Sequence, residues 1–162
     1  MSLPYLVFNH VCIIVKDMKE AAKNWQTFLG VKEEDCQTSE FDVEGEDARL
    51  LICNIPSGNG TWIQLVQPLD EKGGMASFLA RRGEGVQHIC FVCPDSKMGE
   101  LDQHVKDNTS FKWLFPEPRG PGPVGEKYGM IHPKTSNGVI IETLSKGWDR
   151  DLLANQPPVV NK

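Results

Sequence analysis

The chain has 162 residues, of which 40% are hydrophobic and 24% charged, and its formal net charge is −5. This composition indicates a folded globular protein with a sizeable core, and its length fits one domain. The sequence has no apolar run of roughly 18 residues and no secretory signal, which argues against a membrane partner. It has no basic stripe, which argues against a nucleic-acid partner. We therefore expect a cytoplasmic protein that acts on a small molecule, in a reducing compartment because its five cysteines are odd in number.

The first half of the chain predicts a strand, a helix and three further strands. A β-branched run at residues 10–15 predicts the first strand. Apolar residues at near-helical spacing then predict a helix over residues 18–29, which Asp17 caps and Gly30 ends. The three further strands are predicted at residues 36–41, 48–55 and 61–67, the last entered through the turn at 57–60.

The second half predicts the same order after a short connecting helix. Met75, Phe78 and Leu79 suggest that helix, and Gly83 ends it. A strand at residues 88–93, a helix capped by Asp95 and ending at Asn108, and strands at 111–115, 127–132 and 138–144 follow. Two segments fall outside this order: a loop rich in proline and glycine at 116–125, expected to cover the second half, and a tail at 147–162.

The two halves resemble each other when position i is set against position i+78. This i+78 relation aligns His10 with His88, Cys12 with Cys90, Asp17 with Asp95, Lys19 with Lys97, Asn59 with Asn137, Gly60 with Gly138 and Ile63 with Ile141. We interpret the chain as a single α+β domain over residues 1–162. It consists of two βαβββ modules, at about 7–69 and about 85–146, that form a cupped mixed sheet.

Four polar residues interrupt the apolar strands of these modules. Because side chains alternate along a strand, His10 faces away from Val11 and Ile13, which the helix is expected to cover. The same alternation places His88 on the concave face of the second module. Gln64 and Glu142 interrupt the last strand of each module, and burying such groups without partners costs on the order of 1 to 3 kcal/mol or more.

The spacing of the four residues supplies the missing partners. The interval along the chain from His10 to Gln64 equals the interval from His88 to Glu142. Two imidazoles, an amide oxygen and a carboxylate suit one divalent ion such as Zn²⁺, Co²⁺, Ni²⁺, Mn²⁺ or Fe²⁺. A lone strand histidine is more often a hydrogen-bonded core residue, but the repetition favours a shared metal site.

Three of the cysteines bear on this site. Cys12 and Cys90 share the face of the histidines, where we interpret them as small packing residues. Cys90 and Cys93 form a C-x-x-C pair, but positions three apart in a strand face opposite sides, so we predict no zinc site from this pair.

The motifs that carry these residues resemble the vicinal oxygen chelate superfamily, and more narrowly the methylmalonyl-CoA epimerase family. The similarity covers residues 8–145 and is most specific at residues 78–88 and 132–134. The resemblance implies a glyoxalase-like fold with metal ligands at His10, Gln64, His88 and Glu142. It also implies a coenzyme A thioester as substrate, and folds of this type are commonly homodimeric.

The resemblance further implies a reaction in which a proton is removed from the carbon beside a thioester carbonyl. We expect Glu46 or Asp47 to act as a base, with Glu142 combining the roles of ligand and proton relay. A solvated acidic loop is the alternative interpretation for Glu46 and Asp47. Lys134 and Arg82 are candidates to bind the phosphates of coenzyme A, with a plain surface role as the alternative.

Three other functions of the same superfamily compete with this one. His10, His88 and Glu142 alone form the two-histidine, one-carboxylate set of iron dioxygenases. A glutathione-dependent lyase of the glyoxalase kind uses the same enolisation. A binding protein of the bleomycin-resistance type keeps the fold without the metal, but such proteins usually lack the four ligands, and a fold alone does not decide among these functions.

Overall fold

The computed structural model describes residues 6–43, 45–120 and 126–145. The strands are β1 (Val7–Ile14), β2 (Gln37–Val43), β3 (Ala48–Gly58), β4 (Thr61–Pro68), β5 (Gly85–Val92), β6 (Tyr128–Ile131) and β7 (Ile140–Leu144). The α-helices are α1 (Met18–Leu29), α2 (Gly73–Arg82) and α3 (Met98–Asn108). Three short 3-10 turns, η1 (Glu33–Asp35), η2 (Asp95–Lys97) and η3 (Pro133–Thr135), lie between them. No described helix has the length and apolar character needed to cross a membrane.

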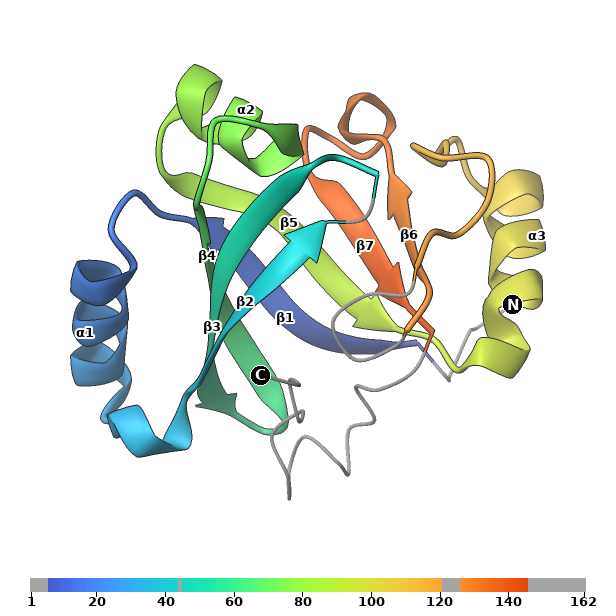
Figure 1. Ribbon diagram of the computed structural model, residues 1–162. Helices are drawn as coiled ribbons and strands as arrows, with labels where there is room; N and C mark the ends of the chain where they lie inside the picture. Colours follow the sequence, from blue (N-terminus) through green and yellow to red (C-terminus); the bar gives the residue numbers. More distant parts are fainter. Residues whose placement is uncertain (1–5, 44, 121–125, 146–162) are drawn as a thin grey trace.

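All the strands belong to one curled mixed sheet with the order β2-β3-β4-β1-β5-β7-β6 (Figure 1). Within each half, the first strand pairs in parallel with the last, β1 with β4 and β5 with β7. The two halves join through the antiparallel pair of β1 and β5 at the centre of the sheet. This architecture confirms the α+β class and the cupped mixed sheet expected from the sequence.

The register of the central pair shows how the repeat is folded. Val11 pairs with Ile89, and on either side His10 pairs with Cys90 and Cys12 with His88. The i+78 relation exchanges these last two pairs, so a pseudo-twofold axis passes between Val11 and Ile89. The two halves therefore place equivalent side chains around one point of the sheet.

The two faces of the sheet carry different layers. On the convex face, Ile13, Ile63 and Leu65 pack with α1, as the sequence alternation predicts. On the concave face, Ile14, Ile52 and Val66 pack with α2, which covers this part of the curl (Figure 1). The helix α3 packs over the second half through Leu101 and Val105.

Local signals at the ends of elements explain several of these positions. The Asp17 side chain accepts a hydrogen bond from the Glu20 amide and so caps α1, and Gly30 ends it with a φ of 68°. The strands β3 and β4 turn through Asn59 and Gly60, whose φ angles of 53° and 70° match a type I′ hairpin turn. These elements follow the predictions from the sequence.

Two predictions for the second half are wrong. Residues 111–115 do not form a regular strand, since Trp113 makes only an isolated bridge to Ile131. The segment still follows β6 through hydrogen bonds such as Leu114 N–H to the Met130 carbonyl at 2.6 Å. Pro116 and Pro118 lie just beyond it and lack the N–H groups needed to extend a ladder.

The helix of the second half also begins differently from the prediction. Asp95 starts the 3-10 turn η2, and α3 begins only at Met98, with Lys97 at the cap position and no capping side chain. The extra turn moves Asp95 out of the cap position that Asp17 occupies in the first half. Most of the predicted 116–125 loop, residues 121–125, and the predicted tail at 147–162 lie outside the described residues.

Candidate metal centre

Three donor atoms from three strands converge on the concave face. His10 Nε2 lies 3.2 Å from His88 Nε2 and 3.5 Å from Glu142 Oε2. His88 Nε2 lies 3.2 Å from the same carboxylate oxygen. Both histidines are 2% exposed, so this cluster is shielded from water. The cross-strand register of β1, β5 and β7 therefore brings together side chains from the two ends of the described chain.

The far nitrogens of both imidazoles are held by amide oxygens. His10 Nδ1 lies 2.7 Å from Asn9 Oδ1, and His88 Nδ1 bonds Gln87 Oε1. An amide oxygen only accepts, so each Nδ1 carries the proton and donates it. In the neutral ring this leaves a lone pair on each Nε2, the arrangement of metal-binding histidines whose other ring nitrogen donates to a fixed acceptor.

The donor set fits a divalent metal ion. With both rings neutral, two imidazole lone pairs and a carboxylate oxygen face one another at 3.2 to 3.5 Å, and they repel unless a cation or proton lies among them. Donors bound to one ion at about 2.1 Å each lie about 3.0 to 3.4 Å apart in octahedral or tetrahedral geometry. The observed spacing is therefore close to that of a formed site.

Gln64 contributes to the same part of the concave face. Its side chain is 9% exposed and lines the same cavity as His10, His88 and Glu142. The Gln64 Nε2 group donates to Asn54 Oδ1 at 3.1 Å, which orients the amide and leaves its oxygen to act as a ligand. The structure thus brings all four predicted ligands to one cavity.

The cluster is strongly coupled electrostatically. Burial lowers the pKa of His10, and the neighbouring His88 lowers it further against the opposing effect of Glu142. Burial alone would also lower the pKa of His88, but its contacts with Cys12 and Glu142 outweigh this and raise it well above the usual value. Burial would raise the pKa of Glu142, yet His88 and then His10 bring it below its usual range. Without a metal, one proton on His88 therefore balances the carboxylate.

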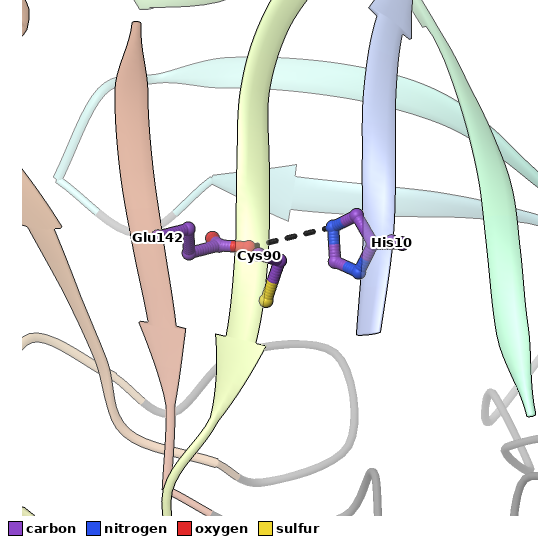
Figure 2. A group of neighbouring side chains, drawn as sticks. All are labelled: His10, Cys90 and Glu142. Atoms are coloured by element: carbon purple, nitrogen blue, oxygen red, sulfur yellow. Dashed lines mark ion pairs between the residues drawn. The ribbon is translucent and has the colours of Figure 1, made fainter. Parts of the chain in front are cut away.

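A thiol adjoins this cluster. Cys90 is fully buried on β5, between His10 of β1 and Glu142 of β7 (Figure 2). Its Sγ lies within 4.8 Å of ligand atoms of both residues, which are themselves within that distance of each other. Burial and the nearby Glu142 carboxylate raise the pKa of the Cys90 thiol well above its usual value. The prediction that Cys90 shares the histidine face is confirmed.

The cluster forms the floor of a cavity of about 330 Å³. The walls are mainly apolar and come from both halves of the chain: Phe41, Val43, Leu50, Ile52, Val66, Met75, Phe78, Leu114, Phe115, Tyr128, Met130, Ile140 and Leu144. An apolar cavity with a few convergent polar groups is the usual form of a small-molecule site. The cavity therefore joins a candidate metal centre to space for a ligand.

Of the other predicted site residues, some line the cavity in the structure and others do not. Glu46 lines the cavity, and its Oε2 accepts the Gly74 amide hydrogen at 2.9 Å. The Asp47 side chain is 87% exposed and pairs with Lys72, and it is not among the described residues that line the cavity. Arg82 and Lys134 are also exposed and outside the described lining, although the Arg82 guanidinium lies 5.8 Å from the centre of the Phe78 ring.

Two charged residues that line the cavity, Arg81 and Glu126, were not predicted from the sequence. Arg81 and Arg82 lie three and four positions after Phe78, and both spacings share a face of a helix, so the helical phase of α2 did not separate them. Glu126 is only 3% exposed and follows the proline- and glycine-rich segment. No periodicity assigns a face to a residue in such a position, so its burial had no signal in the sequence.

A family model describing the Glyoxalase/Bleomycin resistance protein/Dioxygenase superfamily matches residues 9–113. The chain therefore belongs to this superfamily, which agrees with the curled sheet and with the resemblance found in the sequence.

Within the superfamily, the chain is similar to epimerases. It is 28% identical over 135 residues to the ethylmalonyl-CoA/methylmalonyl-CoA epimerase of Cereibacter sphaeroides, covering 83% of this chain and 93% of the relative. A structure of the Streptomyces coelicolor methylmalonyl-CoA epimerase in complex with 2-nitronate-propionyl-CoA matches with a TM-score of 0.64 and 25% identity, covering 86% of this chain and 96% of that one. The Mycobacterium tuberculosis methylmalonyl-CoA epimerase matches with a TM-score of 0.69 over 90% of this chain and 91% of its own, and at 24% identity it supports the fold alone.

Proposed function

We propose that this chain is a metal-dependent enolising enzyme that epimerises an acyl-CoA thioester of the methylmalonyl-CoA type. The observation that carries the proposal is the convergence of His10, His88 and Glu142 at 3.2 to 3.5 Å on the floor of an apolar cavity. The similarity to methylmalonyl-CoA epimerases supports the substrate class.

The candidate ligands are His10, Gln64, His88 and Glu142, and the candidate ions are Co²⁺, Zn²⁺, Ni²⁺, Mn²⁺ and Fe²⁺. A divalent ion held there would act as a Lewis acid toward the negative charge that develops on the thioester oxygen. The ligands from β1 and β4 are neutral, whereas Glu142 of β7 carries a negative charge and receives the imidazole contacts directly. Asn9 and Gln87 hold the two imidazoles in the tautomer that such an ion requires.

Glu46 is the better placed of the two predicted bases. Its carboxylate reaches the cavity and is oriented by the Gly74 amide, whereas Asp47 is exposed and paired with Lys72. In the proposed reaction the C–H bond beside the thioester carbonyl breaks, and Glu46 takes the proton while the electron pair passes to the carbonyl oxygen. The enolate then needs a proton on its other face.

Glu126 is our candidate for returning that proton. It lines the same cavity from the second module, while Glu46 lines it from the first. Two carboxyl groups from opposite halves suit an epimerisation, in which one removes a proton and the other, protonated, delivers one. This assignment differs from the expectation that Glu142 combines the roles of ligand and relay, and it leaves Glu142 as a ligand.

The coenzyme A part of the substrate must extend beyond the cavity. A volume of about 330 Å³ is near the lower limit of ligand pockets, roughly 300 Å³, and suits an acyl group with its thioester. Arg81 at the cavity, with the exposed Arg82 and Lys134, is proposed to meet the phosphates as charged donors. We also propose, on the basis of the sequence, that the protein is a homodimer. Light scattering after size-exclusion chromatography tests this oligomeric state.

The experiment that tests the function measures proton exchange. Protein stripped of metal and reloaded with each candidate ion is incubated with methylmalonyl-CoA in deuterated water, and NMR follows loss of the α-proton signal. We expect ion-dependent exchange that His10→Ala abolishes and His104→Ala, on α3 outside the described cavity lining, retains. A metal-loaded protein without exchange would overturn the epimerase proposal.

A further inference from the structure

Two buried thiols lie on the floor of the candidate metal centre, and the proposed reaction uses neither. Cys12 and Cys90 are both fully buried and are linked by the same i+78 relation as the histidines. Each lies two positions after a histidine in its strand, so each faces the concave side with that histidine. Their role as small packing residues accounts for their burial but not for their place among the ligands.

The strand register places each thiol between two candidate ligands. Across the sheet, Cys90 is the direct partner of His10 on one side and of Glu142 on the other. In the equivalent row, Cys12 is the direct partner of His88 and of Gln64. The four ligands therefore form two rows with a cysteine at the centre of each.

The row of Cys90 is the more compact. The Sγ of Cys90 and ligand atoms of His10 and Glu142 lie within 4.8 Å of one another, and Figure 2 shows the three side chains on adjacent strands. Zinc binds sulfur at about 2.3 Å and nitrogen or oxygen at about 2.0 to 2.2 Å, so at tetrahedral angles the sulfur lies about 3.5 to 3.7 Å from each of the other donors. A movement of at most about 1.3 Å therefore brings all three atoms to one ion.

We propose that Cys90 Sγ is a further ligand of the ion held by His10 and Glu142, which makes the centre selective for thiophilic divalent ions. The proposal rests on the metal site of the proposed function and adds to it a donor of different chemistry. On binding, the S–H bond breaks, the proton leaves to solvent and a sulfur–metal bond forms, with no change of oxidation state. Sulfur ligands favour Zn²⁺, Co²⁺ and Cd²⁺ over Mn²⁺ and Mg²⁺.

Cobalt provides the direct readout. The full-length protein is stripped with a chelator, reloaded with one equivalent of Co²⁺ and checked for bound metal by elemental analysis. A thiolate ligand then gives a sulfur-to-cobalt charge-transfer band in the near ultraviolet, which nitrogen and oxygen ligands do not give. We expect this band in the wild-type protein and its loss in Cys90→Ser, with one ion per chain still bound.

Two other buried thiols serve as controls. Cys53 is 1% exposed and packs on the convex side with Leu65, away from the described cavity lining, so Cys53→Ser should keep the full band. Cys12→Ser should keep it as well. A band that disappears in Cys12→Ser and persists in Cys90→Ser would overturn the assignment to Cys90.

A measurement on the wild-type protein makes the test independent of how the variants fold. X-ray absorption of the zinc-loaded protein should show one sulfur scatterer at about 2.3 Å beside the nitrogen and oxygen shell at about 2.0 to 2.1 Å. A bound zinc ion with only nitrogen and oxygen neighbours would overturn the thiol ligand while the epimerase proposal, read by proton exchange, stands. A protein that binds no metal would overturn both.

Discussion

The two halves of the chain place equivalent residues around one axis but give them different chemistry. The first half supplies His10 and Gln64, both neutral, whereas the second supplies His88 and Glu142, which form a direct contact of 3.2 Å. The i+78 relation holds at every one of these positions. Duplication thus explains where the candidate ligands lie, and divergence after it explains why the negative charge is on one side.

The surroundings of the two ligand pairs differ as well. In the first half, β2, β3 and β4 are fully paired, and Asn54 of β3 holds Gln64 at 3.1 Å. In the second half, the segment before β6 makes two isolated bridges in the described residues, from Trp113 to Ile131 and from Arg119 to Tyr128, and no continuous ladder. The first half is therefore the more regular scaffold, and the second carries the charge and the irregular wall of the cavity.

The largest effect is expected to distinguish Glu46 from Asp47, the two acidic residues in the turn between β2 and β3. Glu46→Gln should slow α-proton exchange by about 10²- to 10⁴-fold, the usual contribution of a general base, because the amide cannot take the proton. Metal content should be unchanged, since Glu46 is not among the candidate ligands. Asp47→Asn should stay within about threefold of the wild type, because this side chain is 87% exposed and such surface changes are usually small. Equal losses in both variants would remove Glu46 as the base.

The unequal charge of the two halves predicts unequal metal affinities. Glu142→Gln removes the carboxylate charge from the candidate ligands and should weaken metal binding by more than about 100-fold, more than a change outside the ligand set causes. Gln64→Ala removes a neutral ligand and should cost about tenfold. Competition with a chromophoric chelator measures both constants, and thermal melting checks that each variant is folded. A larger loss from Gln64→Ala would reverse the proposed asymmetry.

The residues that hold the imidazoles provide a finer test of the two halves. Asn9 and Gln87 are equivalent under the i+78 relation and bond the Nδ1 atoms of His10 and His88. Replacing either with alanine should lower metal affinity by about 10- to 100-fold. Asn9→Ala should be the more severe, because Asn9 is 1% exposed whereas water can replace the half-buried Gln87. Chelator competition on matched samples decides the order, and an unchanged affinity in both would contradict the tautomer argument.

Protonation of His88, in the second half of the chain, should control metal binding. The pKa of His88 is raised well above its usual value, where the contacts with Cys12 and Glu142 outweigh burial. Below that pKa the metal must displace the His88 proton, so in Cys90→Ser, which has no thiol proton to release, affinity should rise by about tenfold per pH unit and level off above it. Chelator competition between about pH 6 and about pH 9 measures the slope, and each ion bound should release a proton to the buffer. A flat profile across this range would show that His88 is already neutral.

The positions of the four candidate ligands could be predicted from the sequence because two independent regularities select them. Strand alternation separates His10 from Val11 and Ile13, and the i+78 relation repeats both its position and its chemistry at His88. The register of β1 with β4 and of β5 with β7 then follows from the same repeat, which placed Gln64 and Glu142 in the cavity. The helix caps of the first half, Asp17 and Gly30, were readable from local chemistry alone.

Other features depend on tertiary contacts that no local pattern carries. Glu126 is 3% exposed and lines the cavity, but its neighbours in the sequence have no apolar period that would reveal this. The segment at 111–115 alternates like a strand, but its hydrogen bonds to β6 are interrupted, so propensity alone overstated it. Arg81 and Arg82 both share a helical face with Phe78, and the folded structure places Arg81 at the cavity and leaves Arg82 outside its described lining.

The smallest effect is expected on the free energy of unfolding, at the starts of the equivalent helices in the two halves. Asp17 accepts a hydrogen bond from the Glu20 amide at 3.0 Å, so Asp17→Ala should lower the free energy of unfolding by about 1 kcal/mol, the usual value of an N-cap. Its repeat partner Asp95 lies in a 3-10 turn, caps no helix, and makes only an exposed contact of 3.7 Å with Lys127. Asp95→Ala should therefore change stability by less than about 0.5 kcal/mol. Urea unfolding of the metal-free protein measures both, and equal losses would mean that η2 and α3 depend on Asp95 for a cap after all.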